Sequence, residues 1–136
     1  MRDPFRGYRP WFYAAAAYNL LWGTAVVLYP RSLLYFAGLS DPKAVPFAQV
    51  IGMMVGVYAY GYYLLARAPQ RYAALIWIGL AGKTLGPIGF LYSAATGALP
   101  WTFAWVCLFN DVIWWPAFWS FALKYARPEH RLLADD

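Results

Sequence analysis

The chain has 136 residues, of which 62% are hydrophobic, 21% aromatic and 12% charged, and its formal net charge is +5. A soluble domain carries roughly 25% charged residues, and one of this size cannot hide so much apolar surface, because too much of its area stays exposed. The composition therefore excludes a water-soluble domain and predicts a single all-α transmembrane domain, residues 1–136.

Four apolar segments are each near the roughly 20 residues that a helix needs to cross the hydrocarbon core. We predict spans at about 11–29, 46–66, 72–94 and 101–125. The first span has no signal-peptide cleavage layout, and Pro30 and Arg31 follow it, so we interpret it as permanent. Aromatic rings prefer the headgroup level and support the span ends; they are Trp11, Phe12, Tyr13, Tyr60, Tyr62, Tyr63 and Trp101.

The connection after the first span, about residues 30–40, begins with a proline and ends near a glycine. Its apolar residues recur at helical spacing, so we predict a short helix in the membrane interface. It is either a structured connector or a lid over a lateral entrance. The remaining connections, "RAPQR" and "ATGALP", can join only antiparallel neighbours. The predicted fold class is an integral membrane four-helix bundle with antiparallel up-down spans.

The basic residues predict the orientation of the spans. Eight flank one side of the predicted membrane region: Arg2, Arg6, Arg9, Arg67, Arg71, Lys124, Arg127 and Arg131. Arg31 and Lys43 alone flank the other side. Since basic loops stay inside, we expect both termini and the tail, 126–136, to be cytoplasmic. We also expect membrane lipids as partners and no binding of nucleic acid. The compact chain without targeting signals indicates a bacterial cytoplasmic membrane.

Two charged residues lie in the middle of predicted spans. Lys83 is fourteen positions before Gly97, the centre of the last hairpin, and Asp111 is fourteen after it, so both should lie at the same depth. Unpaired, each would cost on the order of 2.5–3.5 kcal/mol in a bilayer. We therefore predict a Lys83–Asp111 ion pair, with Asn19 and Asn110 supplying further hydrogen bonds in the same layer.

A proline follows each of these charges in its span. Pro87 cannot donate to the carbonyl of Lys83, and Pro116 cannot donate to that of Val112. Both carbonyls are predicted to be free acceptors beside the charged pair. The alternative is that a neighbouring hydroxyl, such as that of Thr84, fills the gap.

Glycines form stripes on two predicted spans. They are Gly79, Gly82, Gly86 and Gly89 on the third and Gly52 and Gly56 on the second. Small residues allow helix backbones to approach, so we interpret both stripes as helix-packing surfaces. Packing within one chain and the seam of a homodimer, or of a larger membrane complex, both remain open.

The single cysteine, Cys107, excludes an internal disulfide and a thiolate metal cluster, and the single histidine, His130, lies in the tail. We expect no metal site and no cofactor. The segments "YNLLWGTAVVLYPRSLLYFAGL" and "FAQVIGMMVGVYAYGYYLLAR" make the chain similar to the DoxX-like superfamily of small four-helix bacterial membrane proteins. The resemblance implies a link to quinone-coupled electron transfer or thiol redox partners, as in some relatives. No catalytic motif carries over, and a lone cysteine disfavours a dithiol mechanism.

The leading functional prediction is a pocket for a quinone, isoprenoid, sterol or lipid, whose polar head meets the Lys83–Asp111 layer. The candidate ligand-binding residues are Asn19, Trp22, Tyr58, Lys83, Asn110, Asp111, Trp114 and Trp115, with Trp105 as a further wall. We expect a cavity lined by Trp114 or Trp115. Ordinary packing of these aromatics is the alternative for each one singly.

Two other functional classes remain open. In an intramembrane enzyme acting on such a molecule, Asp111 or a neutral Lys83 would move protons. In an accessory or assembly subunit, the ion pair would only fix helix register. A proton-coupled carrier is a weaker possibility, since four helices would have to dimerise.

Overall fold

The computed structural model describes residues 3–127, and every regular element in that range is helical. The α-helices are α1 (Arg9–Leu28), α2 (Pro30–Phe36), α3 (Ala44–Arg67), α4 (Pro69–Tyr72), α5 (Leu75–Ala95), α6 (Ala104–Asn110) and α7 (Trp115–Tyr125). Two 3-10 turns, Trp101–Phe103 and Val112–Trp114, precede α6 and α7. Arg2, His130, Arg131 and the rest of the predicted tail beyond Arg127 lie outside the described residues.

Four helical segments are long and apolar enough to cross a membrane: Arg9–Leu28, Ala44–Arg67, Leu75–Ala95 and Trp101–Tyr125. Their outer faces carry large apolar side chains, such as Val57, which is 74% exposed, and Leu85, which is 65% exposed. Lipid tails cover such surfaces at no cost, whereas water does not. The protein is therefore an integral membrane protein with an all-α, four-helix arrangement, as the sequence predicts.

Prolines explain where several helices begin. α1, α2, α4 and α7 each carry proline in the first two positions, where the missing N–H is not needed and the fixed φ suits a helix. The predicted fourth span, 101–125, is not continuous, because α6 ends at Asn110 and α7 begins at Trp115. Because the helix restarts, Pro116 lies in a first turn. A proline in a helix interior would cost about 3 kcal/mol.

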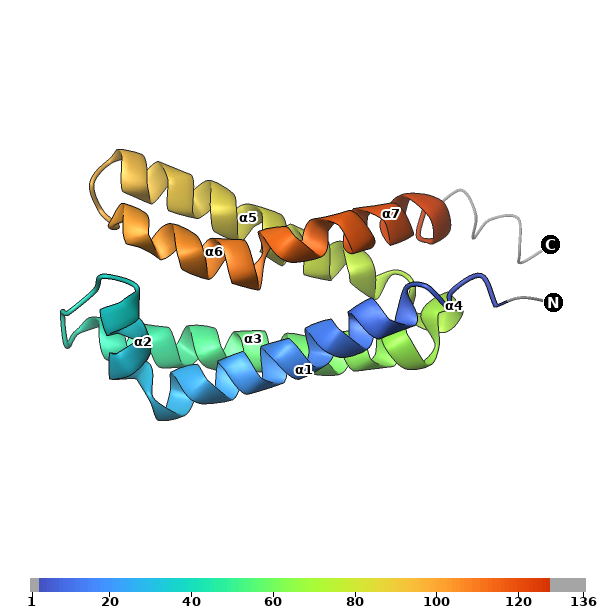
Figure 1. Ribbon diagram of the computed structural model, residues 1–136, viewed down its shortest axis with the longest axis horizontal. Coiled ribbons are helices and arrows are strands. Elements are labelled where there is room, and N and C mark those ends of the chain that lie inside the picture. Colours follow the sequence, from blue (N-terminus) through green and yellow to red (C-terminus); the bar gives the residue numbers. More distant parts are fainter. Residues whose placement is uncertain (1–2, 128–136) are drawn as a thin grey trace.

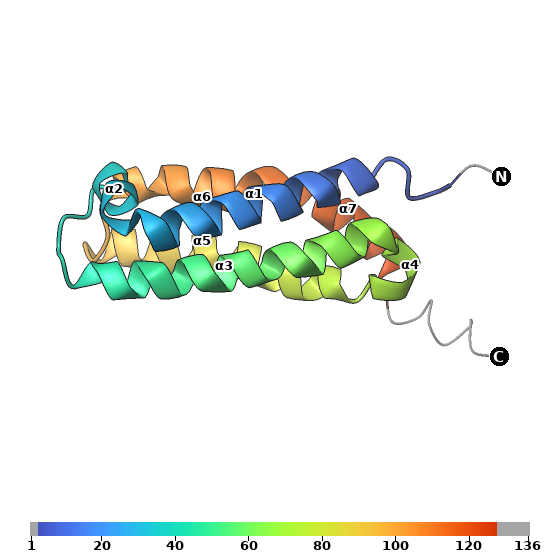
Figure 2. The same ribbon diagram turned by 90° about the horizontal axis from the view of Figure 1, so that it is seen from below.

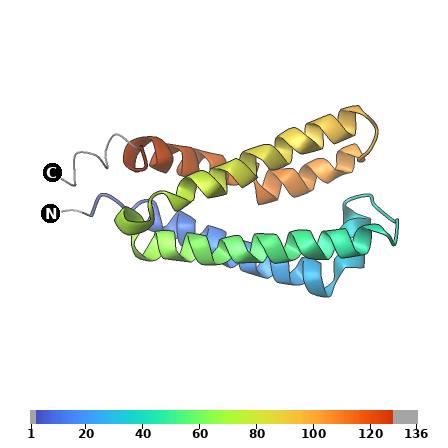
Figure 3. The same cartoon turned by 180° about the vertical axis from the view of Figure 1, so that it is seen from behind.

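The spans form two hairpins. α1 lies beside α3, and α5 lies beside α6 and α7 (Figures 1 and 2). Seen from behind, the two hairpins meet near α4, where both ends of the described chain also lie (Figure 3). At this end Arg9 joins α1 to the end of α3, because its guanidinium donates to the carbonyl oxygens of Ala66 and Arg67 at 2.7 and 2.9 Å. These are terminal carbonyls of α3, which its own helix leaves unpaired.

Glycine allows α1 and α3 to pack closely. A methyl group built on Gly23 would lie 2.9 Å from the backbone nitrogen of Gly56, and one on Gly52 would lie 2.9 Å from the Val26 side chain. The amide of Gln49 adds a hydrogen bond to the Val27 carbonyl at 3.0 Å. Gly52 therefore serves packing within one chain.

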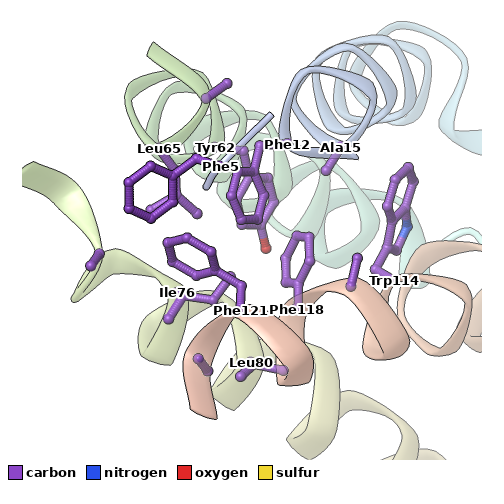
Figure 4. Close-up of a cluster of buried hydrophobic side chains, with 14 residues drawn as sticks. Phe5, Phe12, Ala15, Tyr62, Leu65, Ile76, Leu80, Trp114, Phe118 and Phe121 are labelled. Atoms are coloured by element: carbon purple, nitrogen blue, oxygen red, sulfur yellow. The ribbon is translucent and has the colours of Figure 1, made fainter. Parts of the chain in front are cut away.

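One aromatic core joins the two hairpins near the chain ends. Phe12 of α1 and Phe118 and Phe121 of α7 are fully buried there (Figure 4). Phe12 meets Phe121 edge to face at 4.9 Å between ring centroids, a geometry that aromatic pairs favour. Tyr62 of α3 lies in this core as well, so the predicted places of Phe12 and Tyr62 in the headgroup belt are wrong.

Toward the loops, each hairpin has its own small core. Val26, Leu34 and Ala48 form the first, and Phe90, Ala94 and Cys107 form the second. Leu34 attaches α2 to the α1–α3 hairpin, while Tyr35 and Phe36 of α2 face outward. The predicted short helix is thus confirmed at Pro30–Phe36. The Thr102 hydroxyl donates to the Ala37 carbonyl at 3.1 Å, which connects the two hairpins at their loop end.

Candidate functional site

Lys83 of α5 and Asp111, at the end of α6, meet in the middle of the bundle. Lys83 Nζ lies 4.0 Å from Asp111 Oδ1, and the two side chains are only 4% and 10% exposed. The predicted ion pair is therefore present. Pairing offsets part of the cost of placing two charges at this depth.

The Lys83 ammonium has a second strong partner. It donates a hydrogen bond to the backbone carbonyl of Asn110 at 2.5 Å. The rings of Tyr62 and Trp114 lie 5.6 and 5.8 Å from Nζ, close enough for a cation–π attraction in a site with little water. Lys83 is thus held by a carbonyl, a carboxylate and two aromatic rings.

The break between α6 and α7 creates the acceptor for Lys83. In a continuous helix, the Trp114 N–H would donate to the Asn110 carbonyl. Here it donates to the Asp111 carbonyl at 3.2 Å, and the Asp111 backbone leaves the helical region at φ −124° and ψ −61°. The Asn110 carbonyl is consequently released from the helix and turns to the ammonium.

Both carbonyls that the prolines were predicted to free have donors. Trp115 Nε1 donates to the Lys83 carbonyl at 3.0 Å, and the Trp115 backbone N–H donates to the Val112 carbonyl. The prediction of free acceptors beside Pro87 and Pro116 is therefore wrong, and Thr84 does not fill the gap either. A buried carbonyl without a donor is costly, and the indole of a neighbouring helix satisfies it here.

A cavity of about 330 Å³ borders the ion pair. Its walls come from α1, α3, α5 and the segment 103–111, so it lies between the two hairpins. Six of the predicted residues line it: Asn19, Trp22, Tyr58, Lys83, Asn110 and Asp111. The other lining residues are Ile51, Met54, Val55, Tyr62, Gly79, Gly82, Gly86, Phe103, Val106 and Cys107. The site thus combines a few polar groups with mostly apolar walls, as small-molecule pockets usually do.

Three of the predicted tryptophans are not in this lining. Trp114 packs into the aromatic core, Trp115 completes the hydrogen bonding of α5, and Trp105 is 64% exposed on the outer face. The expectation that Trp114 or Trp115 would line the cavity is wrong, because the helix break at Asp111 aims both side chains at neighbouring helices. Tyr62 lines the cavity instead. The aromatic pattern at the span ends misses this position, because it assigns Tyr62 to the headgroup belt.

The glycine stripe of α5 clears space for side chains instead of allowing backbones to touch. A methyl group on Gly79 would lie 2.8 Å from the Tyr62 ring, and one on Gly86 would lie 3.0 Å from Asp111 Oδ2. One on Gly82 would reach the Tyr58 hydroxyl at 3.4 Å, and one on Gly89 would meet nothing within 4 Å. Three of the four glycines are therefore part of the cavity wall.

Several polar atoms near the pair have no hydrogen-bond partner within residues 3–127. They are Oδ1 of Asn19, Oδ1 of Asn110 and Oγ1 of Thr84. Asn19 is 2% exposed and lines the cavity. Asn110 has a fixed orientation, because its Nδ2 donates to Asp111 Oδ1 at 2.9 Å. Buried polar groups are normally paired, so each of these atoms favours a further partner.

A second hollow, an outer groove of about 480 Å³, adjoins the cavity. It runs between α3 and α5 and is lined by Met54, Val57, Tyr58, Tyr60, Gly61, Tyr62, Leu64, Leu75 and Ile78. Met54, Tyr58 and Tyr62 line both the groove and the cavity. These three side chains therefore form the shared wall between the cavity and the outer groove.

No family model, curated protein or solved structure matches this chain. Within residues 3–127, no cluster of three or more histidine, cysteine, aspartate or glutamate side chains could hold a metal ion. The structure shows an integral membrane four-helix protein with an ion pair beside a mostly apolar cavity.

Proposed function

We propose that this protein binds a small lipophilic molecule, a quinone, isoprenoid, sterol or lipid, in the cavity between its two hairpins. The polar head of the molecule meets the Lys83–Asp111 layer. The observation that carries the proposal is the cavity of about 330 Å³, which has both members of the ion pair in its wall.

The position of the ion pair supports binding over a purely structural role. A pair that only fixes helix register needs no space beside it, and an empty space there costs the lining atoms their packing contacts. Here a cavity lies next to the pair, and Gly82 and Gly86 form part of its wall. The buried Asn19 Oδ1 also lacks a partner in the described chain. Both features suit a site that receives a polar head.

The proposed location is a bacterial cytoplasmic membrane with both termini on the cytoplasmic side. Arg9, Arg67, Arg71 and Lys124 belong to helix ends near the chain termini, whereas Arg31 and Lys43 belong to the opposite end (Figure 1). This distribution supports the positive-inside orientation. A reporter fused after Asp136 should be cytoplasmic and one inserted at Ser93–Gly97 external; the reverse result would overturn the orientation. Similarity to DoxX-like proteins remains part of the proposal.

The test of binding uses two glycines of one helix. Gly82→Leu should fill the cavity, because the new side chain points toward Tyr58, whereas Gly89→Leu enters open space. Native mass spectrometry of protein purified in a gentle detergent should show a retained hydrophobic molecule on the wild type and on the Gly89 variant, and little on the Gly82 variant. A total lipid extract should raise the unfolding temperature of the same two proteins only.

The opposite results are equally clear. If the Gly82 variant retains the same molecule, or gains the same thermal stabilisation, the cavity is not the binding site. If no molecule is retained and lipid extract stabilises none of the three proteins, the pair is structural and the protein acts through its outer surface.

A further inference from the structure

The cavity wall holds unpartnered acceptor oxygens of Asp111, Asn110 and Asn19, together with the hydroxyls of Tyr58 and Tyr62, which can donate or accept. Asp111 Oδ1 accepts from Asn110 Nδ2, but Asp111 Oδ2, which faces Gly86, accepts no hydrogen bond from residues 3–127. Asn110 Oδ1 is an unpartnered acceptor as well, and the amide cannot turn over without placing its oxygen against the carboxylate. Asn19 adds a third unpartnered oxygen.

The Lys83 ammonium already has one hydrogen-bond partner and three further neighbours. The Lys83 ammonium donates to the Asn110 carbonyl, lies beside Asp111 and faces two aromatic rings. A ligand head that only accepts hydrogen bonds, such as a quinone carbonyl, would meet the carboxylate oxygen without a proton to share. A charged head would lose its hydration in this apolar cavity while facing a pair whose charges cancel. The remaining complement is an uncharged donor.

The outer groove can hold a hydrocarbon chain attached to this head. It shares Met54, Tyr58 and Tyr62 with the cavity and runs between α3 and α5. Its outer rim includes Val57, Tyr60 and Ile78, all exposed on the lipid-facing surface. A chain that begins at the ion pair would reach the bilayer between these helices by displacing the side chains of the shared wall, Met54, Tyr58 and Tyr62.

We infer that the ligand is a lipophilic alcohol, whose hydroxyl donates to Asp111 Oδ2 and whose chain leaves through the outer groove. The inference rests on the proposed function and narrows its ligand class. Hydrogen bonds to a carboxylate are about twice as strong as neutral ones, and in this apolar cavity the hydroxyl supplies the specificity. The Asn19 amide, which lines the cavity and whose Oδ1 has no partner within residues 3–127, offers a further polar contact to the head.

The test compares molecules that share one chain. The probes are geranylgeraniol, its methyl ether and geranylgeranoic acid, each titrated into the purified protein in detergent and followed by thermal unfolding and native mass spectrometry. The alcohol should bind roughly tenfold or more tightly than the ether, which keeps the shape and loses the donor. The acid should bind more weakly than the alcohol above the range in which it ionises.

A paired variant removes the head site while keeping the bundle neutral. In the Lys83→Met/Asp111→Leu double variant, the alcohol and the ether should bind with equal affinity. The groove is tested separately with Gly61→Leu, since nothing lies within 4 Å of a methyl group there. It should weaken geranylgeraniol several-fold and leave the shorter geraniol unchanged.

Each contrary result identifies what fails. Equal binding of alcohol and ether to the wild type, both lost on Gly82→Leu, overturns the hydroxyl and leaves the proposed binding function standing. Tightest binding of the acid overturns it in favour of an anionic lipid. Binding of all probes that Gly82→Leu does not change shows surface association only, and then the cavity fails as a site together with the inference.

Discussion

Near the chain termini, side chains of both hairpins meet in one aromatic core, whereas toward the loops each hairpin keeps a small core of its own. Lys83 and Asp111 lie where these two regions meet, and the cavity begins beside them. The terminal half holds the hairpins together through Phe12, Phe118 and Phe121. In the loop half, the Thr102–Ala37 hydrogen bond joins the two hairpins, whereas the ion pair joins α5 to the end of α6 within one hairpin.

This difference shows how a small membrane protein can hold space open. Helices in lipid associate through packing and polar contacts, since lipid tails are as apolar as the side chains themselves. Interlocked rings in one half supply the packing, so the other half can keep glycine next to a charged pair. The expected effects of substitutions should therefore differ between the two regions.

The largest effect is expected where the regions meet. Lys83→Met or Asp111→Leu alone leaves a buried charge without its partner, which should cost about 3–5 kcal/mol of stability in detergent. The double change should recover much of that loss, as measured by chemical or thermal unfolding in a double-mutant cycle. Silent single changes, or effects that simply add, would show that the two charges do not interact.

The same substitution in the two regions gives the next contrast. Phe118→Ala removes a fully buried ring of the shared core. It should cost about 3 kcal/mol of unfolding free energy, because the ring's packing contacts are lost and a cavity is left behind. Phe103→Ala changes a half-buried cavity wall and should cost roughly 1 kcal/mol or less. Equal losses in unfolding free energy would mean that the loop half is packed as tightly as the terminal half.

Within the loop half, backbone proximity should matter more than side-chain volume. Gly23→Ala forces a methyl group against Gly52 and Gly56 and should destabilise by about 1–3 kcal/mol through overpacking. Gly56→Ala meets nothing within 4 Å and should be neutral or stabilising by up to about 1 kcal/mol, because alanine favours the helix. Thermal unfolding of the two variants checks the contrast, and a tolerated Gly23→Ala would contradict it.

The smallest effect compares two indole hydrogen bonds. Trp115→Phe leaves the Lys83 carbonyl without a donor in the middle of the membrane, which should cost about 1–2 kcal/mol. Trp77→Phe frees the Ala126 carbonyl near the chain end, where water can replace the indole, so its cost should stay below about 1 kcal/mol. Unfolding free energies that are equal within error would indicate that water reaches Lys83.

Much of the fold follows from properties along a single helix. Four apolar stretches of membrane length and the short helix after Pro30 are readable without any tertiary contact, because each depends on neighbouring residues alone. The helix break at Asp111 was less visible. Pro116 indicates an interruption of the helix. The restart at Trp115 depends on contacts with another helix, since the Trp115 indole donates to the Lys83 carbonyl of α5.

The candidate site was only partly predictable. Equal distances from Gly97 place Lys83 and Asp111 at one depth, and Asn19, Trp22 and Tyr58 do line the cavity near them. Trp114 and Trp115 do not, and Tyr62 was assigned to the surface. Composition and depth leave the rotation of each helix about its axis undetermined, and that rotation decides which ring faces the pair.

The sequence by itself determined that the helices lie in a lipid bilayer, how many spans there are and how deep each charge lies. These properties depend on apolar length and on position along the chain. The tertiary structure alone decided that the glycines of α5 make room for Tyr62 and Asp111, that Trp115 serves the Lys83 carbonyl, and that a cavity remains beside the pair. The physical reason is that such contacts join residues on different helices. Their geometry is fixed only when two hairpins, closely packed at one end, leave space beside the charges in their middle.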